Sequence, residues 1–339
     1  MSEQQGRMQL STDELRTSLQ LHARACQTAA GNAFFNSFEY VTDLHNGNYS
    51  GCLIKGLKLL ASCKAIDPIS YSSIHKGSAF YWIGMAAYLS NDYQTATFFF
   101  DAAVSEDLRS GHHPITRSTP SFKFILAQGD LQEQAAKPLV EALQARLQLA
   151  IDDYTSRPGV PATTPQFSLA VLRESLLLPS LTKEHAHWRS ISTALISFAL
   201  EWYYLNAFLD LGTAGGTLEP FLVHLFKGCL IFESLLRLNP RDPPPSTATS
   251  LHPVLRHLHS YLRLPSVPTI RAPSFAHVLA DLPNSSTSIT DCVTFAGKVR
   301  NTLGHSLGWQ ASFTNSEYNK LVFMILASCF QSVSCLYRP

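Results

Sequence analysis

The chain has 339 residues, of which 45% are hydrophobic and 15% charged, so it has enough apolar material for one large domain or two ordinary ones and is not a disordered protein. Its formal net charge of +1 excludes nucleic-acid binding through an overall positive charge, so any affinity for RNA or DNA would come from one region. The seven cysteines contain no C-x-x-C pair, which argues against a zinc ribbon or a disulfide framework and favours a reducing, cytoplasmic setting.

The sequence predicts neither a secretory signal nor a membrane span. Residues 1–16 have no apolar core and carry acidic residues early. The longest apolar candidate, 191–209, contains Glu201 and Asn206, so a buried bundle helix is favoured over a spanning one. We therefore expect no membrane contact.

Apolar residues recur at spacings of three and four along nearly every long segment, which predicts an all-α protein. Two proline-rich breaks interrupt this pattern, at 155–165 and at 239–253. The first predicts a boundary between an N-terminal region, 1–155, and a C-terminal region, 166–339. The second predicts a loop inside the C-terminal region, because helical patterns lie on both sides of it.

In the N-terminal region, residues 79–107 predict two helices joined by the turn "SND". Small residues at Gly84 and Ala96 would let the two helices approach closely, with Phe100 filling the space beside them. Residues 49–68 predict a further helix, which ends at a proline.

This pattern resembles one tetratricopeptide (TPR) repeat, with Gly84 on its first helix and Ala96, Phe100 and Ala103 on its second. It departs from the repeat at Ala87 and Leu108, where the family has a tyrosine and a proline. The resemblance implies a docking surface for a protein or peptide, and ordinary helical packing is the alternative.

The C-terminal region predicts a four-helix bundle with a long inserted loop. The four main helices and two shorter helical pieces are expected at 188–211, 218–238, 290–306 and 315–337, and at 253–262 and 274–282.

The third of these main helices carries a polar face. Asn301 and His305 are four residues apart and share one side of the helix, which we expect to point away from the chain's own core, with Arg300 at its edge. The opposite, inward face is apolar, with Ala296, Val299, Leu303 and Leu307.

These three polar side chains suit cleavage of an RNA phosphodiester. His305 can transfer a proton at neutral pH, Arg300 can stabilise phosphate charge, and Asn301 can position either group. One histidine cannot easily make both proton transfers, whereas two copies related by a two-fold axis could share them.

The string "RNTLGH" resembles the signature of HEPN-domain proteins, an arginine followed after four to six residues by a histidine. The resemblance implies a helical bundle of four to five helices that dimerises through this face and acts as a metal-independent endoribonuclease. Arg300, Asn301 and His305 would then form a composite site between two chains, without a metal or cofactor.

Two further residues are candidates for contacts at this site. The string "IFESLLR" resembles a helix of the same family, so Glu233 is a candidate to orient a motif side chain or contact substrate, and an ordinary acid on a helix face is the alternative. Lys298 is predicted to contact substrate. Residues 237–310 contain seven basic and three acidic residues, a local charge of +4. Gathered in one patch they would favour a polyanion such as RNA, and the alternative is that they are scattered over a loop and two helix faces.

No P-loop, dinucleotide glycine pattern, H-E-x-x-H or G-x-S-x-G string is present, and no histidine pair has the spacing of a metal site on one helix face. The competing hypothesis is non-catalytic: a helical regulatory or scaffold module that binds RNA or protein without cutting.

Overall fold

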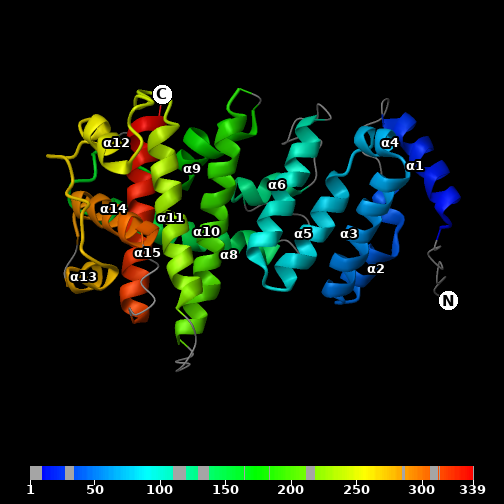
Figure 1. The fold of residues 1–339 in the computed structure, drawn as a ribbon, viewed down its shortest axis with the longest axis horizontal. Helices are drawn as coiled ribbons and strands as arrows, with labels where there is room; N and C mark the ends of the chain where they lie inside the picture. The colour runs from blue at the N-terminus through cyan, green and yellow to red at the C-terminus, as the bar shows by residue number, and fades with distance from the viewer. Residues whose placement is uncertain are drawn as a thin grey trace. The chain divides into compact units, whose positions relative to one another are not determined.

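The computed structural model describes residues 10–26, 34–109, 120–128, 137–163, 165–182, 184–210, 218–284, 287–305, 312 and 314–338. Within these ranges the chain forms helices and no β-strand, which confirms the all-α prediction (Figure 1). The chain divides into two compact units, Met1–Lys137 and Pro138–Pro339.

The N-terminal unit consists of helices, and local side chains fix the starts of some of them. Asn48 accepts a hydrogen bond from the Gly51 amide at the start of α3, and Asp67 accepts one from the Ser70 amide at the start of α4. The helices are α1 (Thr12–Cys26), α2 (Glu39–His45), α3 (Tyr49–Ile66), α4 (Pro68–Ser73), α5 (Gly77–Leu89), α6 (Tyr93–Arg109) and α7 (Ser121–Ile125).

Helices α5 and α6 approach each other closely at Gly84, as the sequence predicts. A Cβ built at Gly84 would lie 2.8 Å from Cε1 of Phe100 and 3.3 Å from the carbonyl oxygen of Ala96, so only glycine fits there. Phe100 in turn stacks on Phe124 of α7, with 4.1 Å between ring centroids. The small residues therefore set the packing of this hairpin.

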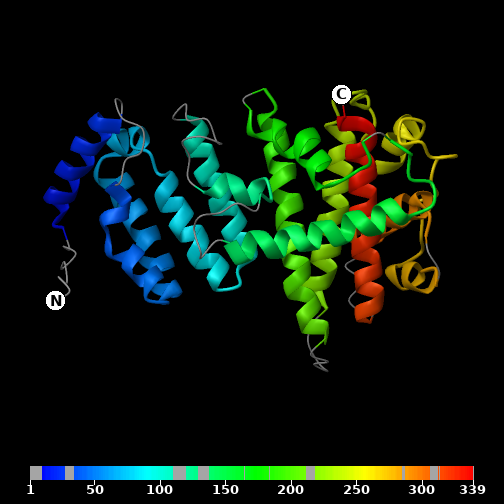
Figure 2. The same ribbon diagram turned by 180° about the vertical axis from the view of Figure 1, so that it is seen from behind.

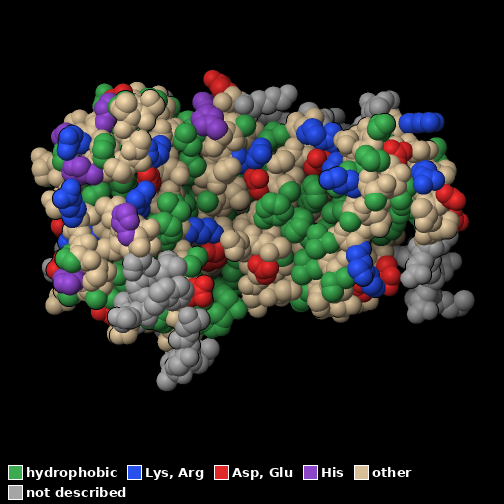
Figure 3. Space-filling model, viewed as in Figure 1, with side chains coloured by type: hydrophobic (Ala, Val, Ile, Leu, Met, Phe, Trp, Pro, Cys, Tyr) green, Lys and Arg blue, Asp and Glu red, His purple; other side chains and the backbone are tan. Residues whose placement is uncertain are grey.

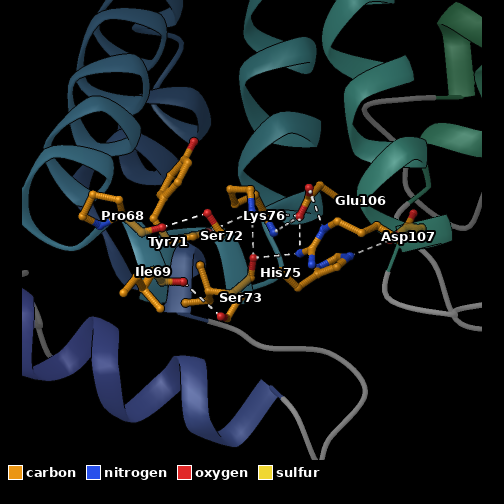
Figure 4. A network of polar contacts seen from close by, with 11 residues as sticks. Pro68, Ile69, Tyr71, Ser72, Ser73, His75, Lys76, Glu106 and Asp107 are labelled. Atoms are coloured by element: carbon orange, nitrogen blue, oxygen red, sulfur yellow. Dashed lines mark hydrogen bonds and ion pairs between the residues drawn. The ribbon is translucent and has the colours of Figure 1, made fainter.

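A buried polar network ties the start of α5 to the end of α6 (Figure 4). Lys76 Nζ lies 3.1 Å from Glu106, which also accepts hydrogen bonds from Arg109. His75 Nε2 lies 2.9 Å from Asp107. Burial raises the pKa of Glu106, but the bonds from Arg109 and Lys76 outweigh it and hold this pKa below its usual value, so the network stays ionic.

The C-terminal unit is built around four helices that pack on one another, α10, α11, α14 and α15. They coincide closely with the four predicted helices. A capping box of Thr314 and Glu317 fixes the start of α15. The helices are α8 (Lys137–Ser156), α9 (Leu169–Leu172), α10 (Ala186–Asp210), α11 (Glu219–Arg237), α12 (Leu251–Leu258), α13 (Phe275–Ala280), α14 (Ile289–His305) and α15 (Asn315–Ser332), which continues as a π-helical turn, Val333–Tyr337.

Helix α8 belongs to the C-terminal unit, so the observed division at Lys137 differs from the predicted boundary at 155–166. Seen from behind, α8 crosses α10 and α15 (Figure 2). Arg146 lies over the ring of Trp202 at 5.3 Å, and Tyr154 donates a hydrogen bond of 2.8 Å to Gln331. The proline-rich segment after α8 is therefore a loop within this unit.

The apolar segment Asn315–Tyr337 is the one helix among the described residues with the length and composition to cross a membrane, and 89% of its most apolar window is buried in the protein. This burial is what a core helix of a soluble protein shows. The predicted bundle helix at 191–209 lies within α10, where Leu195, Ile196 and Phe198 are fully buried.

Candidate functional site: a basic groove at the end of α14

An open groove of about 1580 Å³ lies in the C-terminal unit, between the end of α14 and the segment from Thr249 to Ala276. Its described lining residues include no aspartate or glutamate. In Figure 3, Lys, Arg and His side chains gather over α12 and α14, at the left of the view. The basic residues that line the groove are Arg256, Arg271, Arg300, His252 and His305.

Arg300 is held in the groove wall by a buried carboxylate on α11. Its Nε donates a hydrogen bond of 2.8 Å to Glu233 Oε2, and the Glu233 side chain is only 9% exposed. The other oxygen of Glu233 accepts hydrogen bonds of 2.9 and 2.6 Å from Arg237. Glu233 thus forms ion pairs with two arginines, and the three side chains together have a net charge of +1.

Glu233 therefore contacts Arg300, one of the motif side chains, through the Nε atom. It does not line the groove, because both of its oxygens face arginines. The sequence pointed to Glu233 only through the string "IFESLLR", and its second contact, with Arg237, was not predicted.

Asn301 does not face outward, which corrects the prediction for this residue. Its Nδ2 donates a hydrogen bond of 3.0 Å to the carbonyl oxygen of Ile270, and its Oδ1 lies 3.4 Å from Nη1 of Arg300. The segment 267–273 crosses α14 at this point, with the side chain of Ile270 packed directly on Gly297. A Cβ at position 297 would overlap Ile270, so the close approach depends on the glycine. Asn301 lines the groove with its amide committed to this segment.

His305 is exposed, as predicted, and it is the last residue of α14. It lines the groove and makes no hydrogen bond to a described residue. The inward positions Ala296, Val299 and Leu303 are at most 2% exposed, which confirms the predicted core face, and Leu307 lies outside the described residues.

Lys298 lies outside the groove. Its Nζ pairs with Asp281 at 3.0 Å and sits 5.0 Å from the ring centroid of Phe295. The lysine therefore fastens the end of α13 to α14, and a contact of Lys298 with a ligand in the groove is not favoured.

Arg256, Arg271 and His252 join the predicted residues in the groove. The local excess of positive charge in the sequence included both arginines, but their common position depends on how the loop between α11 and α14 folds. Arg256 Nη2 and His252 Nε2 lie 3.2 Å apart on successive turns of α12.

Chemically, the groove offers guanidinium groups for phosphate oxygens and an exposed imidazole for proton transfer. Among the described residues, no cluster of three His, Cys, Asp or Glu side chains could hold a metal ion. Comparisons with known proteins give no match: no family model, curated protein sequence or solved structure matches this chain.

Proposed function

We propose that the chain is a metal-independent endoribonuclease of the HEPN type, which binds RNA in the basic groove and cleaves it by attack of the ribose 2′-hydroxyl. The observation that carries this proposal is the presence of Arg300 and His305 in one groove with Arg256 and Arg271, with no acid among the described lining residues. A chain of phosphates meets this surface without repulsion.

In this mechanism Arg300 binds the nonbridging oxygens of the scissile phosphate, where negative charge grows in the transition state. Glu233 fixes the guanidinium through Nε and leaves Nη2 for the phosphate. His305 takes the proton of the 2′-hydroxyl or gives one to the leaving 5′-oxygen. Asn301 has a positioning role, because the hydrogen bond from its amide to Ile270 holds the segment 267–273 beside Arg300.

The second proton transfer would come from a second copy of the chain, in a homodimer that joins two His305 faces. We further propose that the hairpin α5–α6 and the helices before it are TPR-like and dock a protein or peptide. A cytoplasmic location fits the six cysteines whose side chains are described, all of which are buried and free.

The test is incubation of the purified chain with labelled RNA in EDTA. Wild type is expected to give products with 2′,3′-cyclic phosphate ends, and His305→Ala is expected to lose cleavage at least about 100-fold. Because His305 is exposed, its removal should change the free energy of unfolding by no more than about 0.5 kcal/mol.

The matched control is His187→Ala, which removes an exposed histidine outside the groove and should leave cleavage unchanged. Full cleavage by pure His305→Ala would overturn the assignment.

A second candidate function is RNA binding without cleavage. This alternative is favoured because Arg300 donates a hydrogen bond to Glu233 and Asn301 donates one to the carbonyl oxygen of Ile270. Both side chains therefore stabilise the fold. Binding of labelled RNA that weakens with salt, without products, would support this alternative.

A further inference from the structure

A second basic cavity in the C-terminal unit shares no described lining residue with the groove. Its volume is about 320 Å³, and its described lining includes three arginines and no aspartate or glutamate. They come from the loop after α11, the turn after α12 and the end of the π-helical turn: Arg241, Arg263 and Arg338.

Arg338 has one donor edge to which no described residue forms a hydrogen bond. Its Nη1 donates a hydrogen bond of 2.9 Å to the carbonyl oxygen of Pro165, and its guanidinium lies 5.8 Å from the ring centroid of Phe167. Its Nε and Nη2 are buried and have no hydrogen-bond partner among the described residues. These two atoms form the edge with which arginine pairs side-on with two oxygens of an oxyanion.

The other two arginines are placed by the backbone around them. Asn239 Oδ1 accepts a hydrogen bond of 3.2 Å from the amide of Arg241, and Arg241 Nη2 donates to the carbonyl oxygen of Arg338 at 3.4 Å. Arg263 follows the fully buried Leu262 and has a φ of 56°, in the left-handed region that few side chains adopt.

No aspartate or glutamate is among the described lining residues. The neighbouring Asp242 lies at the edge of the pocket: its carboxylate accepts a hydrogen bond from the hydroxyl of Tyr261, which raises the pKa of that tyrosine, and lies 3.1 Å from His257 Nε2. Burial raises the pKa of the Cys335 thiol to about 11, against the opposite effect of the three arginines, so the thiol stays protonated. The described lining therefore contains three cations and no anionic side chain.

We propose that this pocket binds a phosphomonoester, a phosphate dianion that carries a small organic group. The dianion offers three terminal oxygens to three guanidinium groups, whereas a carboxylate or an internal phosphodiester brings a single negative charge. The volume is at the lower end of small-ligand pockets and leaves room beside the phosphate. This site does not depend on the RNA groove.

The test is titration calorimetry of the full chain at constant ionic strength with a nucleoside 5′-monophosphate, inorganic phosphate and the unphosphorylated nucleoside. Arg263→Asn is the informative variant, because asparagine tolerates the left-handed backbone and the fold should persist. We expect the monophosphate to bind wild type and to lose affinity about tenfold or more in Arg263→Asn. Lys320→Gln, which removes a cation outside the pocket, should stay within about twofold of wild type.

Inorganic phosphate and the mononucleotide both supply a phosphate dianion. Tighter binding of the nucleotide than of phosphate would show that the nucleoside occupies the part of the pocket beside the phosphate. Three results would each overturn the proposal: no binding of either phosphate, equal binding of the nucleoside, or undiminished affinity in a folded Arg263→Asn.

Discussion

His224 lies in the core of the C-terminal unit with both ring nitrogens satisfied. Its Nε2 donates a hydrogen bond of 2.9 Å to the carbonyl oxygen of Phe198, so its Nδ1 must accept the bond of 2.8 Å from the Tyr318 hydroxyl. The ring also stacks on Phe198 at 4.0 Å. Burial lowers the pKa of His224 to about 3, and the bonded pair defines a neutral tautomer.

This depressed pKa predicts a loss of stability in acid. Between pH 6.5 and 3 the unfolded chain binds a proton at this histidine and the folded chain does not, so the free energy of unfolding falls as the pH falls. From pH 7 to pH 5 the loss amounts to about 2 kcal/mol. Urea unfolding followed by tryptophan fluorescence should show it in wild type, and His224→Gln should show a flatter dependence.

His187→Gln is the control, because it removes an exposed histidine and should keep the wild-type dependence on pH. Parallel curves for wild type and His224→Gln would contradict a neutral buried His224.

Glu233 shows at the same scale how one buried acid can serve both fold and site. Its two oxygens hold Arg237 and Arg300, and Arg237 Nη1 donates a hydrogen bond of 2.7 Å to the carbonyl oxygen of Ala248. Ala248 precedes α12, which carries Arg256 into the groove. The carboxylate therefore links the arginine of the motif to the loop that forms the opposite wall.

At the scale of elements, the segment 267–273 decides which part of α14 remains accessible. Ile270 is buried against Gly297, and its carbonyl oxygen accepts the hydrogen bond from Asn301 one turn further along. The covered stretch ends before His305, which stays exposed. A helix face that is polar in sequence is thus divided into a covered middle and an open end.

Gly297→Ala should displace this segment, because the new Cβ would overlap the side chain of Ile270. We expect a loss of about 1–3 kcal/mol in the free energy of unfolding, from strain at this contact. Hydrogen exchange of the amides in 267–273 should become faster, which mass spectrometry can measure.

Gly304→Ala on the same helix provides the matched control. A Cβ there would lie 3.4 Å from Phe226, an ordinary contact, and alanine favours a helix by up to about 1 kcal/mol. Stability should be unchanged or higher. Equal stability of the Gly297→Ala variant and wild type would contradict the close packing of Ile270.

The inner face of α14 could be predicted because its apolar residues repeat with the helical period, and Val299 and Leu303 are buried accordingly. The covering of Asn301 by another segment could not be predicted. That segment contains Ile270, 31 residues earlier, and is rich in proline and without helical periodicity. The one local sign was Gly297, a glycine inside a helix, which marks close approach of another part of the chain.

At the scale of the whole molecule, the division into units depends on where α8 packs. The prolines after α8 predicted a boundary, since they end a helix, but ending a helix does not end a domain. The core of the C-terminal unit includes Leu143, Leu147 and Tyr154, so α8 contributes a face to it. Local breakers in the sequence locate loops, whereas unit boundaries follow the apolar faces of the helices.

The proposed homodimer has to join two chains near the exposed end of α14. Because the segment 267–273 covers Asn301, a second copy can approach His305 and the groove more readily than the middle of the helix. The composite site then needs His305 of both chains in one shared cleft, one for each proton transfer. A single chain supplies only one of them.

This arrangement predicts that a chain without His305 inactivates a wild-type partner. When wild type and His305→Ala are unfolded, mixed in equal amounts and refolded, about half of the dimers formed by random pairing carry one chain of each kind. In a shared cleft these mixed dimers hold a single His305 and lack one of the two proton transfers, so RNA cleavage should fall to about one quarter of that of the same total amount of wild type, and sedimentation should show a dimer. In a groove complete within one chain, His252 would supply the second proton transfer. The mixture would then keep about half of the wild-type cleavage, and His252→Ala alone would abolish cleavage, a result that would refute the composite site.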